Sequence, residues 1–225
     1  MHLLKSNEPL SRHCHYKTGG NALYYAEPCI TEELIDLIDF ANEKNLEVFV
    51  FGKGANILFS DKPFEAVVIS TAKLNNYMVL SNDIFYAGAG VNLDDFIRFS
   101  ILNGYEGAEN LSGIPGCIGG NIMMNAGAFG TEMKDVVEKV TVINKQRQIE
   151  ILDNDSVGFE YRNTLNLKDK IVLSAQIKLN KDKDNTALSK TVVEINGEII
   201  NKNSAAYLIL KENDSVEFIQ FVGGG

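Results

Sequence analysis

The 225-residue sequence predicts an α+β protein in which a few helices are interspersed among many strands. Residues 32–44 and 92–104 carry apolar residues at helical spacing, whereas many other runs alternate in polarity or are rich in β-branched residues, as strands are. The hydrophobic content of 45% can fill the core of one large or two small domains.

The charge balance, the N-terminal residues and the lengths of the apolar segments limit the partners and the cell compartment that we expect. There are 21 basic and 30 acidic residues, and no run of Lys and Arg interleaved with aromatic residues, which argues against a nucleic-acid surface. The first 17 residues lack the apolar core of a signal peptide, and no uninterrupted apolar segment approaches the length that spans a membrane. We therefore expect a cytoplasmic protein with neither nucleic acid nor membrane as a partner.

The first third of the sequence predicts a β–α–β unit. A helix over 32–44 is followed at once by the strand-like run LEVFVF, which ends at Phe51, and a strand around 22–26 precedes the helix. A further strand is predicted at 66–71. The helix at 92–104 has Asn92 as its expected N-cap and Gly104 as its terminator. Its expected core-facing stripe is Phe96, Phe99, Ile101 and Leu102.

The second half of the sequence is predicted to be mostly sheet. Residues 180–190 are polar and charged, which is typical of a linker. The dipeptide Asn196-Gly197, between two β runs, is a strong hairpin signal. The runs that predict strands are 136–144, 148–152, 171–179, 191–200 and 214–222.

The stretch SGIPGCIGGNIMMNAGAFG, residues 112–130, is rich in glycine and almost free of charge. Apolar residues between the glycines favour a buried, ordered loop over a flexible linker. Because glycine lets a backbone come close to a ligand, we expect this loop to lie against a large flat ligand. The pattern GxGxN plus an aliphatic residue also occurs twice, at 52–57 and 88–93, where it fits either phosphate-binding backbone or two tight turns after strands.

Four motifs together resemble one known family. They are KTGGNALYYAEP at 17–28, GKGANILFSD at 52–61, NLSGIPGCIGGNIMMNAGAFGTEMKDVV at 110–137 and FEYRNT at 159–164. In order and spacing they resemble the UDP-N-acetylenolpyruvoylglucosamine reductases, flavoenzymes that make UDP-N-acetylmuramate for peptidoglycan. The resemblance runs from about Leu10 to Leu179.

This resemblance implies a fold and a domain organisation. The fold is a two-part FAD-binding fold of the vanillyl-alcohol-oxidase type, with FAD between the parts. The first part is expected at 1–72, the second at 73–180 and a linker at 181–190.

The resemblance also implies which residues contact FAD. Backbone amides of one segment are expected to contact the FAD phosphates, and a second set is expected to line the flavin and its phosphates. The first set is Gly52, Gly54, Ala55, Asn56 and Ile57; the second is Ser112, Gly113, Ile114, Gly119, Gly120, Asn125, Ala126 and Gly130.

The implied reaction has two halves, in which NADPH reduces FAD and the flavin then passes hydride to the enolpyruvyl group of the UDP sugar. Arg162 matches the family's active-site arginine, where a guanidinium can pair with the substrate carboxylate. The family also has a C-terminal substrate-binding region with a proton-donating serine and a late glutamate. This sequence has no proline after Pro115 and no such serine motif, so we expect that region to be lost or replaced.

Residues 191–225 resemble something else, the second half of the sulfur carrier protein of thiamine biosynthesis, a β-grasp protein that ends in Gly-Gly. The resemblance implies that Gly224 and Gly225 form a terminus that an activating enzyme adenylates and converts to a thiocarboxylate. The first hairpin and helix of that family have no clear counterpart here.

Three hypotheses stay open on the sequence alone. The chain is a reductase whose proton comes from an unrecognised group, a sulfur carrier attached to a flavin-binding remnant, or a fusion that binds little. His13-Cys14-His15 would place two imidazoles on one strand face, but no further ligand cluster is visible, and we expect no metal site. Cys117 is expected to be a packing residue.

Overall fold

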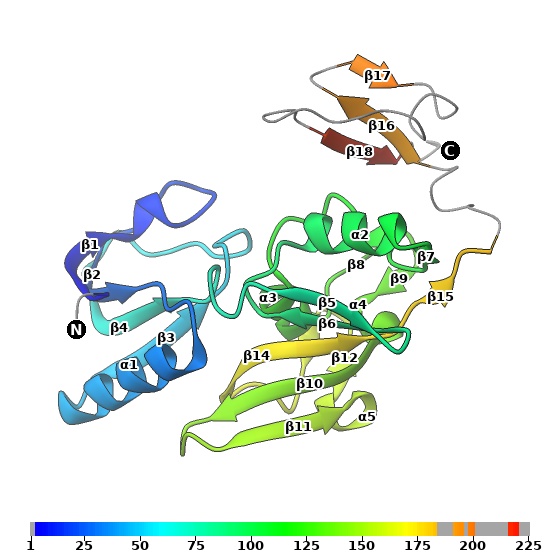
Figure 1. The fold of residues 1–225 in the computed structure, drawn as a ribbon. Coiled ribbons are helices and arrows are strands. Elements are labelled where there is room, and N and C mark those ends of the chain that lie inside the picture. The colour runs from blue at the N-terminus through cyan, green and yellow to red at the C-terminus, as the bar shows by residue number, and fades with distance from the viewer. Residues whose placement is uncertain (1–2, 184–190, 196–197, 201–215, 221–225) are drawn as a thin grey trace.

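The computed structural model describes residues 3–183, 191–195, 198–200 and 216–220. Its main body consists of two units, each built on its own sheet, which lie side by side in Figure 1. A third, small sheet comes from the C-terminal part of the chain. The α+β prediction is therefore confirmed.

The first unit is a four-stranded sheet in the order β1–β2–β4–β3. Strands β2 and β3 both run parallel to β4, and β1 is antiparallel to β2. The predicted β–α–β succession is present, with β4 inserted between its two strands. Helix α1 covers this sheet with Leu34, Leu37 and Ala41, all completely buried. The bounds are β1 Lys5–Pro9, β2 Asn21–Ala26, α1 Thr31–Glu43, β3 Glu47–Phe51 and β4 Phe64–Ser70.

The second unit is a five-stranded antiparallel sheet in the order β11–β10–β14–β6–β5. Helices α2 and α3 lie on one side of it, and α3 packs against β14. A single hydrophobic core joins this sheet, α2 and α3 to α1 and part of the first sheet. The bounds are β5 Met78–Ser81, β6 Ile84–Gly88, α2 Leu93–Leu102, α3 Ile118–Met123, β10 Val137–Asn144, β11 Ile149–Asp153 and β14 Lys170–Ile177.

Short elements join the strands and helices of both units, and four of them pair as two tight hairpins of the second unit, β8–β9 and β12–β13. The glycine-rich stretch, expected as a loop, contains helix α3, and its Met124 is exposed. The short elements are the 3-10 turns Leu10–Arg12 and Glu109–Leu111, β7 Tyr105–Glu106, β8 Gly127–Ala128, β9 Thr131–Glu132, α4 Met133–Val136, α5 Asn154–Val157, β12 Phe159–Glu160, β13 Asn163–Thr164 and β15 Asn180–Lys181.

Helix α2 begins where the sequence predicts. The Asn92 side chain accepts hydrogen bonds from the backbone N–H groups of Asp94 at 2.8 Å and Asp95 at 3.3 Å. The predicted core-facing stripe is wrong at one end, because Leu102 is 66% exposed, and Ile97 is buried in its place. None of the helices that the structure describes is long and apolar enough to cross a membrane.

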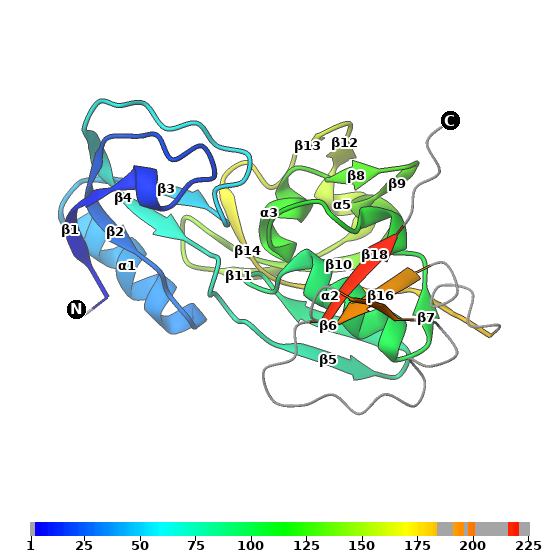
Figure 2. The same cartoon turned by 90° about the horizontal axis from the view of Figure 1, so that it is seen from above.

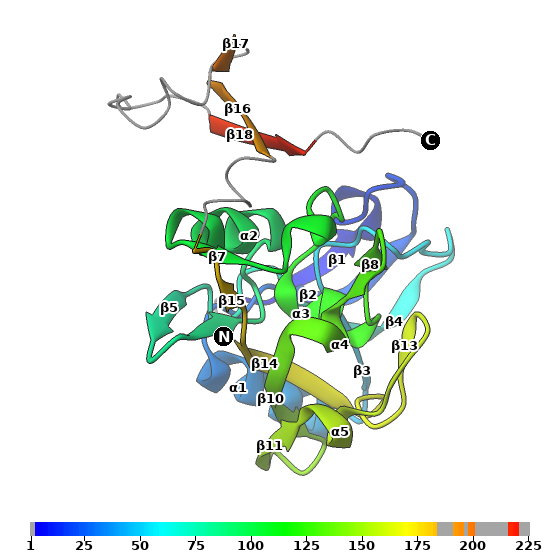
Figure 3. The same cartoon turned by 90° about the vertical axis from the view of Figure 1, so that its right-hand side faces the viewer.

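The C-terminal strands form a three-stranded antiparallel sheet in the order β17–β16–β18. In Figures 1 and 3 this sheet stands on the α2 side of the second unit. The bounds are β16 Thr191–Ile195, β17 Glu198–Ile200 and β18 Val216–Gln220. The predicted hairpin strands pair, and Asn196 and Gly197 lie outside the described residues.

The predicted linker is wrong at its start, because Lys181 belongs to β15, which pairs with β7 in the second unit. The side chain of Lys181 adds an ion pair with Asp83, at 2.8 Å. Residues 184–190 lie outside the described part of the chain.

The N-cap of α2 gives a first prediction. Asn92→Ala should lower the free energy of unfolding by about 1 kcal/mol, because two N–H groups at the helix start lose their acceptor. Urea denaturation measures the change. Asn92→Ser, which retains a capping oxygen, should stay close to the parent, and equal losses in both variants would contradict the role of the cap.

Candidate functional site

A groove of about 430 Å³ opens at the carboxyl ends of the parallel strands of the first unit. Gly52 and Lys53 follow β3, Ser70 ends β4 and Glu27 follows β2. The N-terminal segment closes the other side of the groove with Arg12, His13, Cys14, His15 and Lys17. Ligands of open parallel sheets bind at this end of the strands, and the cationic lining favours an anionic group such as a diphosphate.

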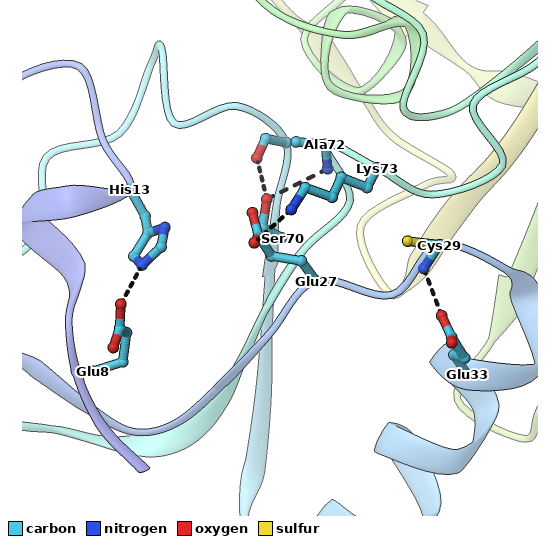
Figure 4. A network of polar contacts seen from close by, with 9 residues as sticks. Glu8, His13, Glu27, Cys29, Glu33, Ser70, Ala72 and Lys73 are labelled. Carbon is cyan, nitrogen blue, oxygen red and sulfur yellow. Dashed lines mark hydrogen bonds and ion pairs between the residues drawn. The ribbon is translucent and has the colours of Figure 1, made fainter. Parts of the chain in front are cut away.

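Hydrogen bonds fix the strand ends that form the groove (Figure 4). The Ser70 hydroxyl donates to the carbonyl of Gly52 at 2.9 Å, and the Thr71 N–H donates to the carbonyl of Phe51 at 2.7 Å. Lys73 pairs with Glu27 at 3.1 Å. Partial burial alone would raise the pKa of Glu27, but the hydrogen bond and charge of Lys73 lower that pKa below its usual value. Glu27 is therefore ionised at neutral pH.

The His13-Cys14-His15 segment is not a strand, which corrects the prediction that its two imidazoles share a strand face. His13 stacks on the ring of Tyr25, with ring centroids 3.9 Å apart, and its Nε2 lies 2.9 Å from a carboxylate oxygen of Glu8. Within the ranges that the structure describes, no group of three metal-ligating side chains is found. His13 is held by packing and one hydrogen bond.

The two glycine segments meet at the boundary between the units. A Cβ added to Gly52 would lie 2.8 Å from the sulfur of Cys117, which directly precedes α3. A Cβ on Gly54 would lie 2.3 Å from the carbonyl oxygen of His13, and one on Gly119 would lie 2.9 Å from the Cβ of Ala89. These three glycines are therefore required by the packing of the protein itself.

Gly120 is different, because packing does not explain its missing side chain. Its backbone is helical, and an added Cβ would meet only the Cys117 sulfur at 3.8 Å and the Gly52 Cα at 3.9 Å, which are ordinary contacts. Glycine inside a helix costs about 1 kcal/mol relative to alanine. A bare position that the protein does not need, at the edge of the groove, fits the close approach of a flat ligand.

Cys117 packs between the two glycine segments. Burial raises the pKa of its thiol above the usual value, although backbone N–H groups of Gly120 and Lys53 point to the sulfur and oppose that rise. The thiol is therefore protonated at neutral pH, as a packing residue would be.

The other predicted cofactor contacts have varied surroundings. The N–H of Gly113 and the hydroxyl of Ser112 both donate to the carboxylate of Asp94, at 2.8 and 3.4 Å. Asn56 is exposed in the turn after β3, and Gly130 lies in the β8–β9 turn. Ile114 and Ala126 pack in or against the core.

Arg162 lies at the far end of α3, in the two-residue turn between β12 and β13. Its side chain is exposed, and its backbone has a left-handed φ of 56°. Gly120 is the third of the six residues of α3, so about 4.5 Å of helix separates it from Met123, the residue to which the hairpin is bonded. In Figure 2 α3 lies between the first unit and the β12–β13 hairpin.

Sequence reasoning missed several groove residues, namely Arg12, Lys17, Lys53 and Ser70. Lys53 stands inside the GKGAN motif, and Ser70 ends a strand that the sequence predicts, so the rule that ligands bind at the carboxyl ends of parallel strands could have found both. Arg12 and Lys17 carry no such signal.

A family profile described as an FAD binding domain matches residues 22–152, more than half of the chain. The chain belongs to the FAD-binding domain family. Its cofactor is therefore FAD, and the groove, the glycine segments and α3 fall within or beside the matched range. A second profile, the ThiS family, matches residues 159–225.

Curated relatives of this FAD-binding domain protein carry the name UDP-N-acetylenolpyruvoylglucosamine reductase. That of Caldanaerobacter subterraneus is 42% identical over 176 residues, which are 78% of this chain and 58% of the relative. Those of Carboxydothermus hydrogenoformans and Staphylococcus aureus strain COL are 36% and 35% identical and cover 82% and 76% of this chain. The chain thus spans between 55% and 61% of the length of these relatives.

Solved structures agree on the fold of this family member. The UDP-N-acetylenolpyruvylglucosamine reductase of Thermus caldophilus has a TM-score of 0.70 at 26% identity and covers 80% of this chain and 64% of its own. A cholesterol oxidase from Brevibacterium sterolicum has a TM-score of 0.59 at 13% identity, covering 85% of this chain and 38% of its own, and it shares the fold alone. The predicted two-part FAD-binding fold is confirmed.

Gly120, at the edge of the groove, gives a second prediction. Gly120→Ala should weaken FAD binding by about tenfold or more while the melting temperature without FAD stays level or rises, because only the cofactor competes for the space of the new methyl group. Quenching of flavin fluorescence and a thermal scan measure the two quantities. A variant that binds FAD like the parent would contradict this account of Gly120.

Gly52→Ala serves as the matched comparison. Its methyl group collides with the Cys117 sulfur, so it should lower the melting temperature even without FAD. The double variant Gly52→Ala/Cys117→Ala removes the colliding atom and should recover most of that loss.

Proposed function

We propose that this chain is the FAD-carrying part of a UDP-N-acetylenolpyruvoylglucosamine reductase, which uses NADPH to form UDP-N-acetylmuramate for peptidoglycan. The observation that carries the proposal is the 42% identity to a curated reductase over 176 residues, a span that includes most of the FAD-binding body. Both NADPH and the UDP sugar are cytoplasmic compounds, so the proposed site of action is the cytoplasm.

The groove and the glycine segments supply the cofactor site in this proposal. Backbone of Gly52, Gly54, Ala55, Asn56 and Ile57 would face the FAD diphosphate, with Arg12, Lys17 and Lys53 providing positive charge. Backbone of the 112–130 stretch would lie along the flavin, and Gly120 gives it room. When bound, FAD supplies the hydride chemistry.

Arg162 would act on the substrate. Its exposed guanidinium, at the tip of a hairpin, can pair with a carboxylate such as that of an enolpyruvyl group. The same positive charge would stabilise negative charge that develops on the carboxylate side when hydride adds to the double bond. No serine motif takes the role of proton donor here, so a water molecule or another group would deliver the proton.

An anaerobic flavin experiment tests the proposal and gives a third prediction. NADPH should bleach the bound flavin, and UDP-N-acetylenolpyruvoylglucosamine should then restore its visible absorbance with formation of UDP-N-acetylmuramate. Arg162→Lys should reduce the rate of reoxidation by about 100-fold while FAD stays bound, because a bidentate partner of the carboxylate is lost.

Two results would count against the proposal. A bound flavin that NADPH does not reduce would exclude the reductase. Reoxidation at the same rate in the parent and in Arg162→Lys would remove Arg162 from the reaction. A surface charge variant such as Arg147→Lys, far along the sheet at the β10–β11 turn, is the matched control and should behave as the parent.

The ThiS-family match favours a second candidate function, a sulfur carrier. Its first part, from residue 159, coincides with strands that belong to the flavin unit, since β14 is central to the five-stranded sheet. Among the described residues from Thr191 onward, β16, β17 and β18 form a sheet of their own. Gly224 and Gly225, the proposed reactive terminus, lie outside the described residues.

The sulfur-carrier candidate gives a fourth prediction. With ATP, an adenylating enzyme and a sulfide donor, the carboxylate of Gly225 would displace diphosphate from ATP, and sulfide would then displace AMP. Intact-protein mass spectrometry should show the gain expected when sulfur replaces oxygen. A chain with one alanine appended after Gly225 should not react but should still bind FAD, and equal labelling of both chains would exclude the candidate.

A further inference from the structure

The β12–β13 hairpin that carries Arg162 cannot hold its own shape. Each strand has only two residues, with Phe159 opposite Thr164 and Glu160 opposite Asn163. So short a hairpin is marginal unless it packs against other structure. The position of Arg162 therefore depends on the contacts that hold these two strands in place.

Asn125, which follows the C-cap of α3, holds the first strand by a hydrogen bond. This side chain is completely buried, and its amide nitrogen donates to the carbonyl oxygen of Glu160 at 2.9 Å and to the carboxylate of Glu132 at 3.2 Å. Its amide oxygen accepts from the backbone N–H of Lys134 at 3.0 Å. One amide group thus links β12, β9 and α4.

The second strand is held two residues earlier, by Met123, the last residue of α3. The hydroxyl of Thr164, which is also buried, donates to the carbonyl of Met123 at 2.9 Å. Glu160 and Thr164 flank the turn on either side, so the two bonds fix both legs of the hairpin. Asn125 and Glu160 are 35 residues apart in the sequence, and Met123 and Thr164 are 41 residues apart. Both bonds are therefore tertiary contacts.

The same amide orients the charge beside Arg162. A hydrogen bond from Lys134, and a weaker one from Asn125, hold the pKa of Glu132 below its usual value, and the positive charge of Arg162 acts in the same direction. The Glu132 carboxylate is therefore ionised and fixed, and it attracts the guanidinium from the side of the β8–β9 hairpin.

We propose that Asn125 is a positioning residue for Arg162, rather than a direct contact of the cofactor. Both N–H groups of its amide are engaged within the protein, which leaves no donor for a ligand, and its oxygen already accepts from Lys134. The functional part of this proposal rests on the role of Arg162 proposed above. The structural part does not.

Asn125→Gly is the sharpest variant for a test. Asn125 has a left-handed φ of 41°, which glycine adopts without strain, so this change removes the amide while relieving the backbone. Asn121→Ala is the matched control, because Asn121 is a buried amide in α3 whose side chain donates to the carbonyl of Cys117, the N-cap residue of that helix, at 3.1 Å. Thr164→Val removes the second anchor and keeps the shape of the side chain.

An NMR measurement tests the positioning role of Asn125 without an assay of enzymatic activity. In the full chain with FAD bound, the heteronuclear NOE at the backbone amides of Tyr161 and Arg162 should fall in Asn125→Gly and in Thr164→Val, and stay at the parent value in Asn121→Ala. If the hairpin amides stay as rigid in Asn125→Gly as in the parent, the proposal is overturned.

A double-mutant cycle measured on kcat tests whether Asn125 acts on the reaction through Arg162. Asn125→Gly should lower kcat by about 10- to 100-fold with FAD affinity retained, because a displaced catalytic group costs rate rather than cofactor binding. In the Arg162→Lys background it should have almost no further effect. Additive losses in the two variants would overturn the coupling. An inactive parent would instead refute the proposed function, and the NOE result would still stand by itself.

Discussion

The structure depends on the close approach of two backbones at the boundary between its two units. Gly52 directly follows β3 in the first unit, and Cys117 precedes α3 in the second, with no room between them for a single methyl group. Each side is fixed separately. The carbonyls of Phe51 and Gly52 are bonded to residues at the end of β4, and the N–H of Ile118 donates to Val91 at 2.8 Å. The protein's own hydrogen bonds therefore fix the crevice between the two units.

Helix α3 connects this crevice to the hairpin that carries Arg162. Its first turn brings Gly119 and Gly120 to the boundary with the first unit, and its last turn supplies the Met123 carbonyl and leads into Asn125. Since the helix packs on β14 in the middle of the second sheet, both of its ends are held by one rigid support. A cofactor laid along α3 would thus have its diphosphate end and the Arg162 hairpin placed by the same element.

Local patterns in the sequence predicted most elements because local physics determines them. Asn92 caps α2 through its own neighbours, and the long β runs became the strands of the second sheet. The errors have long-range causes. Leu102 continues the apolar spacing of α2 but is exposed in the folded chain. Lys181 lies in a polar run typical of a linker, but it pairs with Tyr105, which is distant in the sequence. The role of Asn125 depends on partners such as Glu160, which no local pattern reveals.

Hydrogen exchange measured by mass spectrometry on the full chain, with and without FAD, tests the central claim most directly. FAD should protect peptides that cover residues 52–57 and 112–126, while peptides at the β10–β11 turn exchange equally in both samples. Protection confined to other segments, or none at all at saturating FAD, would contradict a cofactor site built on the contact between Gly52 and α3.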